Sequence, residues 1–180
     1  TGYKCWASPN ITSPAITKPN LHFDVVTYDG SGSDGNEVNG LSFQPEVVWI
    51  KDREDSNHHR AYDAIRGVNS GWLISHTDAP EQYAGYGQFE SFDSGGFTVG
   101  AGTGNAEGTN DSTNHVAYCW DAGTSAATPK SGGSGQTITA SNSWVNADAG
   151  FEILKYSTGG TAGNVGHNLG AIPKFIIIKA

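Results

Sequence analysis

Residues 23–51 read FDVVTYDGSGSDGNEVNGLSFQPEVVWIK, and residues 151–179 read FEILKYSTGGTAGNVGHNLGAIPKFIIIK. The two stretches align without a gap, and the positions they share are structural residue types. The aligned pairs are Phe23 with Phe151, Tyr28 with Tyr156, Asn36 with Asn164, Leu41 with Leu169, Pro45 with Pro173 and Lys51 with Lys179. Each copy predicts an alternating strand, a small-polar connection, a turn at the leucine, and a strand that begins after the proline. Such a ribbon needs partners to cover its apolar faces.

The last strand of each copy is a continuous apolar run. Val47–Ile50 and Phe175–Ile178 lie between a proline and a lysine. Runs of this length predict strands buried between two layers. Between the copies, Asp93-Ser94-Gly95-Gly96 predicts a hairpin turn flanked by Phe92 and Phe97.

Composition indicates an all-β protein with little helix. Glycine is abundant at 25 residues, charged residues make up 16%, and β-branched and aromatic residues recur in short runs between turn residues. The net charge of −8 argues against nucleic acid as a partner, because binding a phosphate backbone requires a basic surface. No apolar stretch has the length of a membrane span, so we expect no membrane insertion.

The chain divides into four segments by composition. Prolines 9, 14 and 19 predict an extended N-terminal arm over residues 1–22. Residues 23–122 form the predicted β-sandwich unit, and residues 123–136 a linker rich in Gly, Ser, Ala and Thr. Residues 137–180 carry the second copy of the opening ribbon, which completes either this sandwich or a neighbouring one. Trp144 is expected in a loop before it.

The order of phrases resembles a known family. VVTY, GLSFQPEVVWIKDR, YDAIRG, SFDSGGFTVG, HVAYCWDAG and the second ribbon follow one another as in a repeat domain of virion structural and tail-fibre-like proteins of bacteriophages, particularly marine phages infecting cyanobacteria. The resemblance covers nearly all of residues 18–180. It implies an antiparallel sandwich of the concanavalin-like or jelly-roll type on the surface of the virion, and it implies no catalytic residues.

Two cysteines stand in matching phrases, Tyr3-Lys4-Cys5-Trp6 and Ala117-Tyr118-Cys119-Trp120. If the phrases occupy equivalent places, each cysteine is a small buried residue rather than half of a mutual disulfide. Neither has the spacing of a zinc ligand, and no cofactor is expected. The loop with Asp29, Asp34 and Glu37 is a weak calcium candidate, since its second copy contains no acid. The run from Lys51 to Asp55 predicts a solvated strand exit.

Catalysis is the minority hypothesis. No strained serine elbow and no phosphate-binding glycine pattern follows a strand. A polysaccharide-degrading enzyme would need two facing carboxylates, for which the sequence offers only unassigned acids. These are Asp52, Glu54, Asp55, Asp63 and Asp93.

Two non-enzymatic roles remain. In the first, the protein is a fibre, tail or head-decoration subunit that binds other virion subunits, including copies of itself, by exchanging strands or arms. In the second, it is an adhesin for host surface polysaccharide, with loop aromatic and amide side chains as its candidates: Tyr83, Tyr86, Asn105, Asn110, Asn114 and Trp144. The expected framework residues are Phe23, Tyr28, Pro45, Trp49, Arg66, Phe97, Trp120, Phe151, Tyr156 and Pro173, with Asp63 as the partner of Arg66.

Overall fold

The computed structural model describes residues 16, 18–68, 71–74, 89–101, 109–123, 126–127, 136–138, 140–158, 160 and 162–179. In this part the chain is nearly all β, as predicted. The only helical element described is the 3-10 turn η1 (Pro19–Leu21). No described helix has the length and apolar character needed to cross a membrane.

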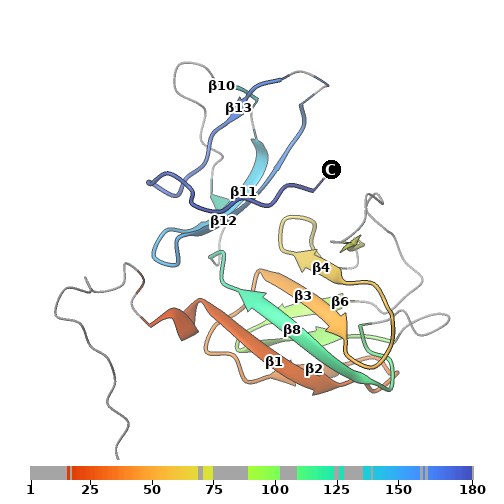
Figure 1. Ribbon diagram of the computed structural model, residues 1–180. Helices are drawn as coiled ribbons and strands as arrows, with labels where there is room; N and C mark the ends of the chain where they lie inside the picture. Colours follow the sequence, from red (N-terminus) through yellow and green to blue (C-terminus); the bar gives the residue numbers. More distant parts are fainter. Residues whose placement is uncertain are drawn as a thin grey trace, which may run out of the picture.

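A two-layer sandwich occupies the first two thirds of the chain (Figure 1). One layer is a five-stranded antiparallel sheet in the order β1-β8-β3-β4-β5. Its strands are β1 (Phe23–Asp29), β8 (Asn114–Trp120), β3 (Val47–Asp52), β4 (Arg60–Asp63) and β5 (Leu73–Ile74). The other layer has the order β2-β7-β6, with β2 (Asn36–Asn39), β7 (Gly96–Val99) and β6 (Phe89–Asp93).

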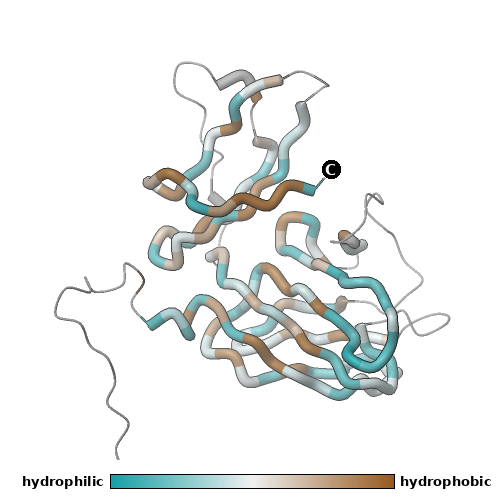
Figure 2. The backbone as a smooth tube through the Cα atoms, in the orientation of Figure 1, coloured by the Kyte–Doolittle hydropathy of each residue, from teal (hydrophilic) through white to brown (hydrophobic). Residues whose placement is uncertain are grey.

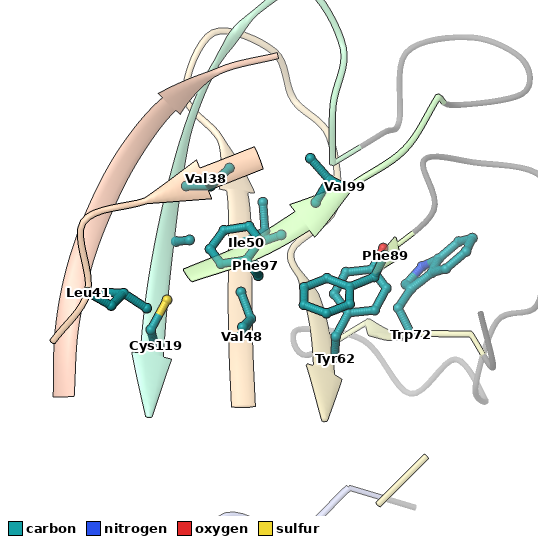
Figure 3. Packing of buried hydrophobic residues seen from close by; sticks show 11 residues of the cluster. Val38, Leu41, Val48, Ile50, Tyr62, Trp72, Phe89, Phe97, Val99 and Cys119 are labelled. Carbon is teal, nitrogen blue, oxygen red and sulfur yellow. The ribbon is translucent and has the colours of Figure 1, made fainter. Parts of the chain in front are cut away.

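Side chains from the two layers meet in one core (Figure 3). Phe97 and Val99 of β7 face Val48 and Ile50 of β3, and all four are at most 2% exposed. Phe89 stacks on Tyr62 with ring centroids 4.8 Å apart. The predicted hairpin is confirmed: β6 and β7 pair around Ser94 and Gly95, and Gly95 adopts a φ of 88° that favours glycine.

The second ribbon belongs to a smaller β region. β11 (Ala140–Asn146) and β12 (Phe151–Tyr156) form an antiparallel hairpin, and β9 (Ala126–Ala127) adds to β11. β10 (Gln136–Ile138) pairs in parallel with β13 (Asn164–Val165). One expectation is therefore wrong, because Trp144 lies in strand β11 rather than in a loop. The short strand β9 falls within residues 123–136, the expected linker.

Polar contacts join the two regions where β8 ends. His22 Nδ1 lies 2.8 Å from Asp121 Oδ2, and Asn146 Nδ2 donates to the same oxygen at 2.6 Å. The ring of Phe151 stacks on Trp120 with centroids 6.1 Å apart. The start of the second ribbon is thus fixed to the end of the first sandwich.

Candidate assembly interface

The chain from Ile172 to Ile178 presents a row of large apolar side chains to solvent. Ile172 and Phe175 are each 81% exposed, and Ile176, Ile177 and Ile178 are 67%, 66% and 69% exposed. Figure 2 shows a hydrophobic run shortly before the C-terminus, which corresponds to residues 175–178. Contiguous exposed apolar residues of this kind mark interaction surfaces.

The prediction of a buried strand at Phe175–Ile178 is wrong in this structure. The equivalent strand β3 is flanked on both edges, with Val48 opposite Cys119 of β8 and opposite Tyr62 of β4. Within the described part of the chain, residues 175–178 pair with no strand. A β-forming sequence without a ladder partner cannot satisfy its backbone groups as a strand, which explains the difference.

A hydrogen bond to the Glu152 carboxylate fixes the turn that precedes this segment. The Glu152 carboxylate accepts the Asn168 backbone N–H at 2.6 Å and the Ser143 hydroxyl at 2.6 Å. Ser143 is 1% exposed in the β11–β12 hairpin. The apolar segment is therefore presented from an anchored turn.

The outer face of the five-stranded sheet carries a second group of exposed apolar side chains. Phe23, Val25 and Tyr118 are 40%, 42% and 38% exposed, and they lie beside the half-buried Trp49 and Trp120. The Phe23 and Trp120 rings are 5.1 Å apart. Sequence reasoning assigned Phe23, Trp49 and Trp120 to the framework and missed this surface. Alternation along β1 and β8 could have indicated it, because it places these rings on one face.

The three predicted glycan residues that the structure describes do not gather at one place. Asn110 is fully buried, and it bonds the Ser33 and Gly100 carbonyls, so it orders loops. Asn114 is exposed and donates to the Glu54 carboxylate. Trp144 is half-buried in β11. Tyr83, Tyr86 and Asn105 lie outside the described residues.

The weak calcium candidates also remain apart. Asp34 Oδ1 accepts the Ala101 N–H at 2.8 Å, while Asp29 uses its backbone carbonyl to hold Asn36. Glu37 is exposed on β2. Among the described residues, these three do not form a cluster with metal-ligand spacing.

Most framework residues have structural contacts. Pro45 and Phe97 are fully buried, and Tyr28 donates its hydroxyl to the Thr109 carbonyl at 2.5 Å. The expected pair is confirmed, with Arg66 Nε 2.6 Å from Asp63 Oδ2. Trp49 Nε1 bonds His59 Nδ1 at 3.1 Å. In the second ribbon Phe151, Tyr156 and Pro173 are only half-buried.

Cys119 is a free, buried thiol between the layers, as expected for a small core residue. Burial, reinforced by Asp24, raises its pKa to about 12, so it is inert as a nucleophile. Cys5 lies outside the described residues.

The acids named for glycosidase chemistry have other contacts. Asp63 is engaged with Arg66, and Asp93 accepts the Thr98 hydroxyl at 2.7 Å. Glu54 and Asp55 are exposed. Asp52 corrects the prediction of a solvated strand exit, because it is only 2% exposed. It lies within 4.8 Å of Asp111 and His115, a group that sequence reasoning missed because Asp111 comes from a distant loop.

Residues 18–180 match the sequence profile of a family described as a domain of unknown function, DUF7483, and the chain belongs to this family. A search of curated proteins found no match. A search of solved structures found none either.

Proposed function

We propose that this DUF7483 domain is a non-catalytic structural protein of a bacteriophage virion surface, and that it assembles with other copies by strand addition. The observation that carries the assembly proposal is the exposed apolar segment 172–178. The virion location is what the ordered phrases of the sequence imply through their resemblance to phage structural repeats. Immunogold labelling of intact particles tests that location.

The first ribbon indicates what kind of strand the segment needs. There β3 is covered on one edge by β8, with Val47, Val48 and Trp49 opposite Trp120, Cys119 and Tyr118. A strand that resembles β8 would give residues 175–178 a ladder partner and cover their apolar side chains. Strand addition of this kind satisfies backbone groups and buries side chains in one step.

The chain itself carries a second β8-like phrase, Tyr3-Lys4-Cys5-Trp6. If Cys5 and Trp6 take the places of Cys119 and Trp120, they lie opposite Ile176 and Phe175 of the acceptor. In β8 the small Cys119 faces the core and Trp120 faces outward. We therefore assign the N-terminal phrase of one copy as the strand added to the C-terminal segment of another. Such head-to-tail contacts build filaments or rings.

Disulfide trapping tests this register. Ile176→Cys should form an intermolecular disulfide with Cys5 under mild oxidation, because facing Cα atoms in an antiparallel ladder are about 4.5–5.5 Å apart. Ile177→Cys is the matched control, since its side chain points to the opposite face and lies across from Lys4. Cys5→Ser in the Ile176→Cys background should abolish the crosslink.

Sedimentation velocity separates the two parts of the proposal. A chain that remains monomeric at about 100 µM would overturn assembly through this segment. If oligomers form with rising concentration but Ile176→Cys does not crosslink to Cys5, self-assembly is supported. The N-terminal phrase is then not the added strand.

A second candidate function, glycan binding, rests on the outer face of the five-stranded sheet. The exposed rings of Phe23 and Tyr118 offer flat apolar surfaces on which a sugar can stack. On a glycan array, Tyr118→Ala should remove binding, whereas Thr27→Ala on the same face should retain it. An unmodified domain that binds no glycan rejects this candidate.

A further inference from the structure

The group Asp52, Asp111 and His115 joins three parts of the first sandwich. Asp52 ends β3, His115 lies opposite it near the start of β8, and Asp111 belongs to the loop that leads into β8. One ligand atom from each residue lies within 4.8 Å of the other two. Asp52 and His115 are 2% and 0% exposed, and Asp111 is half-buried. Two of the three side chains are thus buried, and Asp111 is the partly exposed one.

The imidazole of His115 is held in one orientation with one nitrogen unused. Its ring stacks on Tyr28, with centroids 5.0 Å apart and planes at 14°. Nδ1 lies 3.0 Å from the Thr113 carbonyl, which can only accept, so Nδ1 is the donor of this hydrogen bond. Nε2 is buried and has no hydrogen-bond partner. Metal-binding histidines show this arrangement, in which a carbonyl fixes one nitrogen and leaves a lone pair on the other.

The two carboxylates share the side-chain amide of Asn57 as a neutral hydrogen-bond donor. Asp52 Oδ1 accepts the backbone N–H groups of Glu54 and Asp55 at 2.9 and 3.1 Å, and Oδ2 accepts Asn57 Nδ2 at 2.7 Å. The same Asn57 nitrogen lies 3.4 Å from Asp111 Oδ2. The three hydrogen bonds from Glu54, Asp55 and Asn57 favour the charged form of the Asp52 carboxylate. Asp52 is therefore an anionic ligand at neutral pH.

We propose that Asp52, Asp111 and His115 bind one divalent first-row transition-metal ion, with Zn²⁺ or Mn²⁺ as the expected occupant. Within the described residues, no hydrogen bond or ion pair joins His115 to either carboxylate, although all three lie within 4.8 Å. A shared cation would take a nitrogen of His115 as a ligand and offset two neighbouring negative charges, and Nε2 is the nitrogen that has no hydrogen-bond partner. A nitrogen ligand beside two carboxylates favours these ions over Ca²⁺ and Mg²⁺, which prefer oxygen. The bound ion would fasten the loop of Asp111 to the ends of β3 and β8.

The test uses tag-free protein in a Cys5→Ser background, because a cysteine thiolate is itself a zinc ligand. After EDTA treatment and its removal, isothermal titration with Zn²⁺, Mn²⁺, Ca²⁺ and Mg²⁺ measures affinity and stoichiometry. We expect one Zn²⁺ or Mn²⁺ per chain and a rise of several degrees in Tm at saturating metal. The ¹⁵N resonance of His115 Nε2 should shift on adding Zn²⁺.

Asp111→Asn is the informative variant, and Asp55→Asn is its matched control. Both remove one negative charge, but the exposed Asp55 offers no side-chain atom to the group. Asp111→Asn should weaken Zn²⁺ binding at least tenfold, whereas Asp55→Asn should leave it unchanged. Thermal unfolding of the metal-free Asp111→Asn and Asp55→Asn proteins is recorded beside the titrations, and Asp111→Asn should still show a cooperative transition. This result separates lost binding from lost folding.

Three results would overturn the proposal. One is the absence of stoichiometric binding of Zn²⁺ and Mn²⁺, including the case in which only Ca²⁺ or Mg²⁺ binds. Another is equal affinity of the Asp111→Asn and Asp55→Asn proteins. The third is a His115 Nε2 resonance that does not move when metal binds. None of these outcomes bears on the assembly segment, which is far along the sequence and has its own test.

Discussion

The two ribbons have matching sequences but different surroundings. β1 and β12 are both strands, and the next strand in each copy, β2 or β13, begins at the equivalent asparagine. They differ at the third strand, because β3 lies between β8 and β4 whereas residues 175–178 pair with no strand in the described part of the chain. The first two strands form with different partners, and the third forms only where partners are supplied. A segment with high β propensity therefore forms a strand only where neighbouring strands are available to pair with it.

Matched substitutions at Ile50 and Ile178 provide the strongest contrast between the ribbons. Ile50 is 2% exposed in β3, and its equivalent Ile178 is 69% exposed. Ile50→Ala should lower the free energy of unfolding by about 2–5 kcal/mol, because it leaves a cavity in the core. Ile178→Ala should change it by less than about 0.5 kcal/mol. Urea unfolding at concentrations where the protein is monomeric measures both, and equal losses would contradict the exposed position of the second segment.

The residues that follow the aligned prolines Pro45 and Pro173 give a second contrast, in the pH dependence of stability. Glu46 is fully buried, and its Oε2 accepts the Ala122 N–H at 2.8 Å; the equivalent residue, Lys174, is exposed. Burial, together with the nearby Asp121, raises the pKa of Glu46 to about 7. The folded state therefore holds this proton more tightly than the unfolded chain does. Its stabilising effect is complete below about pH 4.5, and it is lost as the pH rises to about 7.

Over this window the free energy of unfolding should fall by roughly 3 kcal/mol, at about 1.4 kcal/mol per pKa unit. Glu46→Gln should remove that slope, because the amide oxygen can still accept the Ala122 N–H but does not titrate. Lys174→Gln should leave the slope unchanged. Unfolding curves recorded at several pH values between 4 and 8 measure it, and a slope that persists in Glu46→Gln would assign the titration to another group.

Local patterns predicted the elements that depend on local chemistry. The hairpin at Ser94 and Gly95 follows from its turn residues, and the pair of Arg66 with Asp63 follows from their spacing. Alternation along β1 and β8 also places their side chains on the correct faces. These features require only neighbouring residues, so one sequence suffices to predict them.

Features that join distant segments could not be predicted in the same way. Asn110 looked like an exposed loop amide, but its position is set by contacts with Ser33 and Gly100 across the loops. Asp52 looked like part of a solvated run, yet Asp111 and His115 enclose it only after β3 and β8 pair. The apolar run at Phe175–Ile178 was recognised as a strand former, but the sequence could not show that its partner strand is absent from the described chain.

The smallest contrast concerns the two aligned tyrosines. Burial raises the pKa of Tyr28 well above its ordinary value, so its hydroxyl keeps its proton and donates to the Thr109 carbonyl at 2.5 Å. Tyr28→Phe should cost about 1–2 kcal/mol, because it leaves that buried carbonyl without its donor. Tyr156 is half-buried, and its hydroxyl bonds no other described residue. Tyr156→Phe should therefore change stability by only a few tenths of a kcal/mol, and the urea midpoints of the two variants measure the difference. Equal urea midpoints for the two variants would mean that a water molecule replaces the Tyr28 hydroxyl as the donor to the Thr109 carbonyl. This end of the first sandwich would then be as accessible to solvent as the second ribbon.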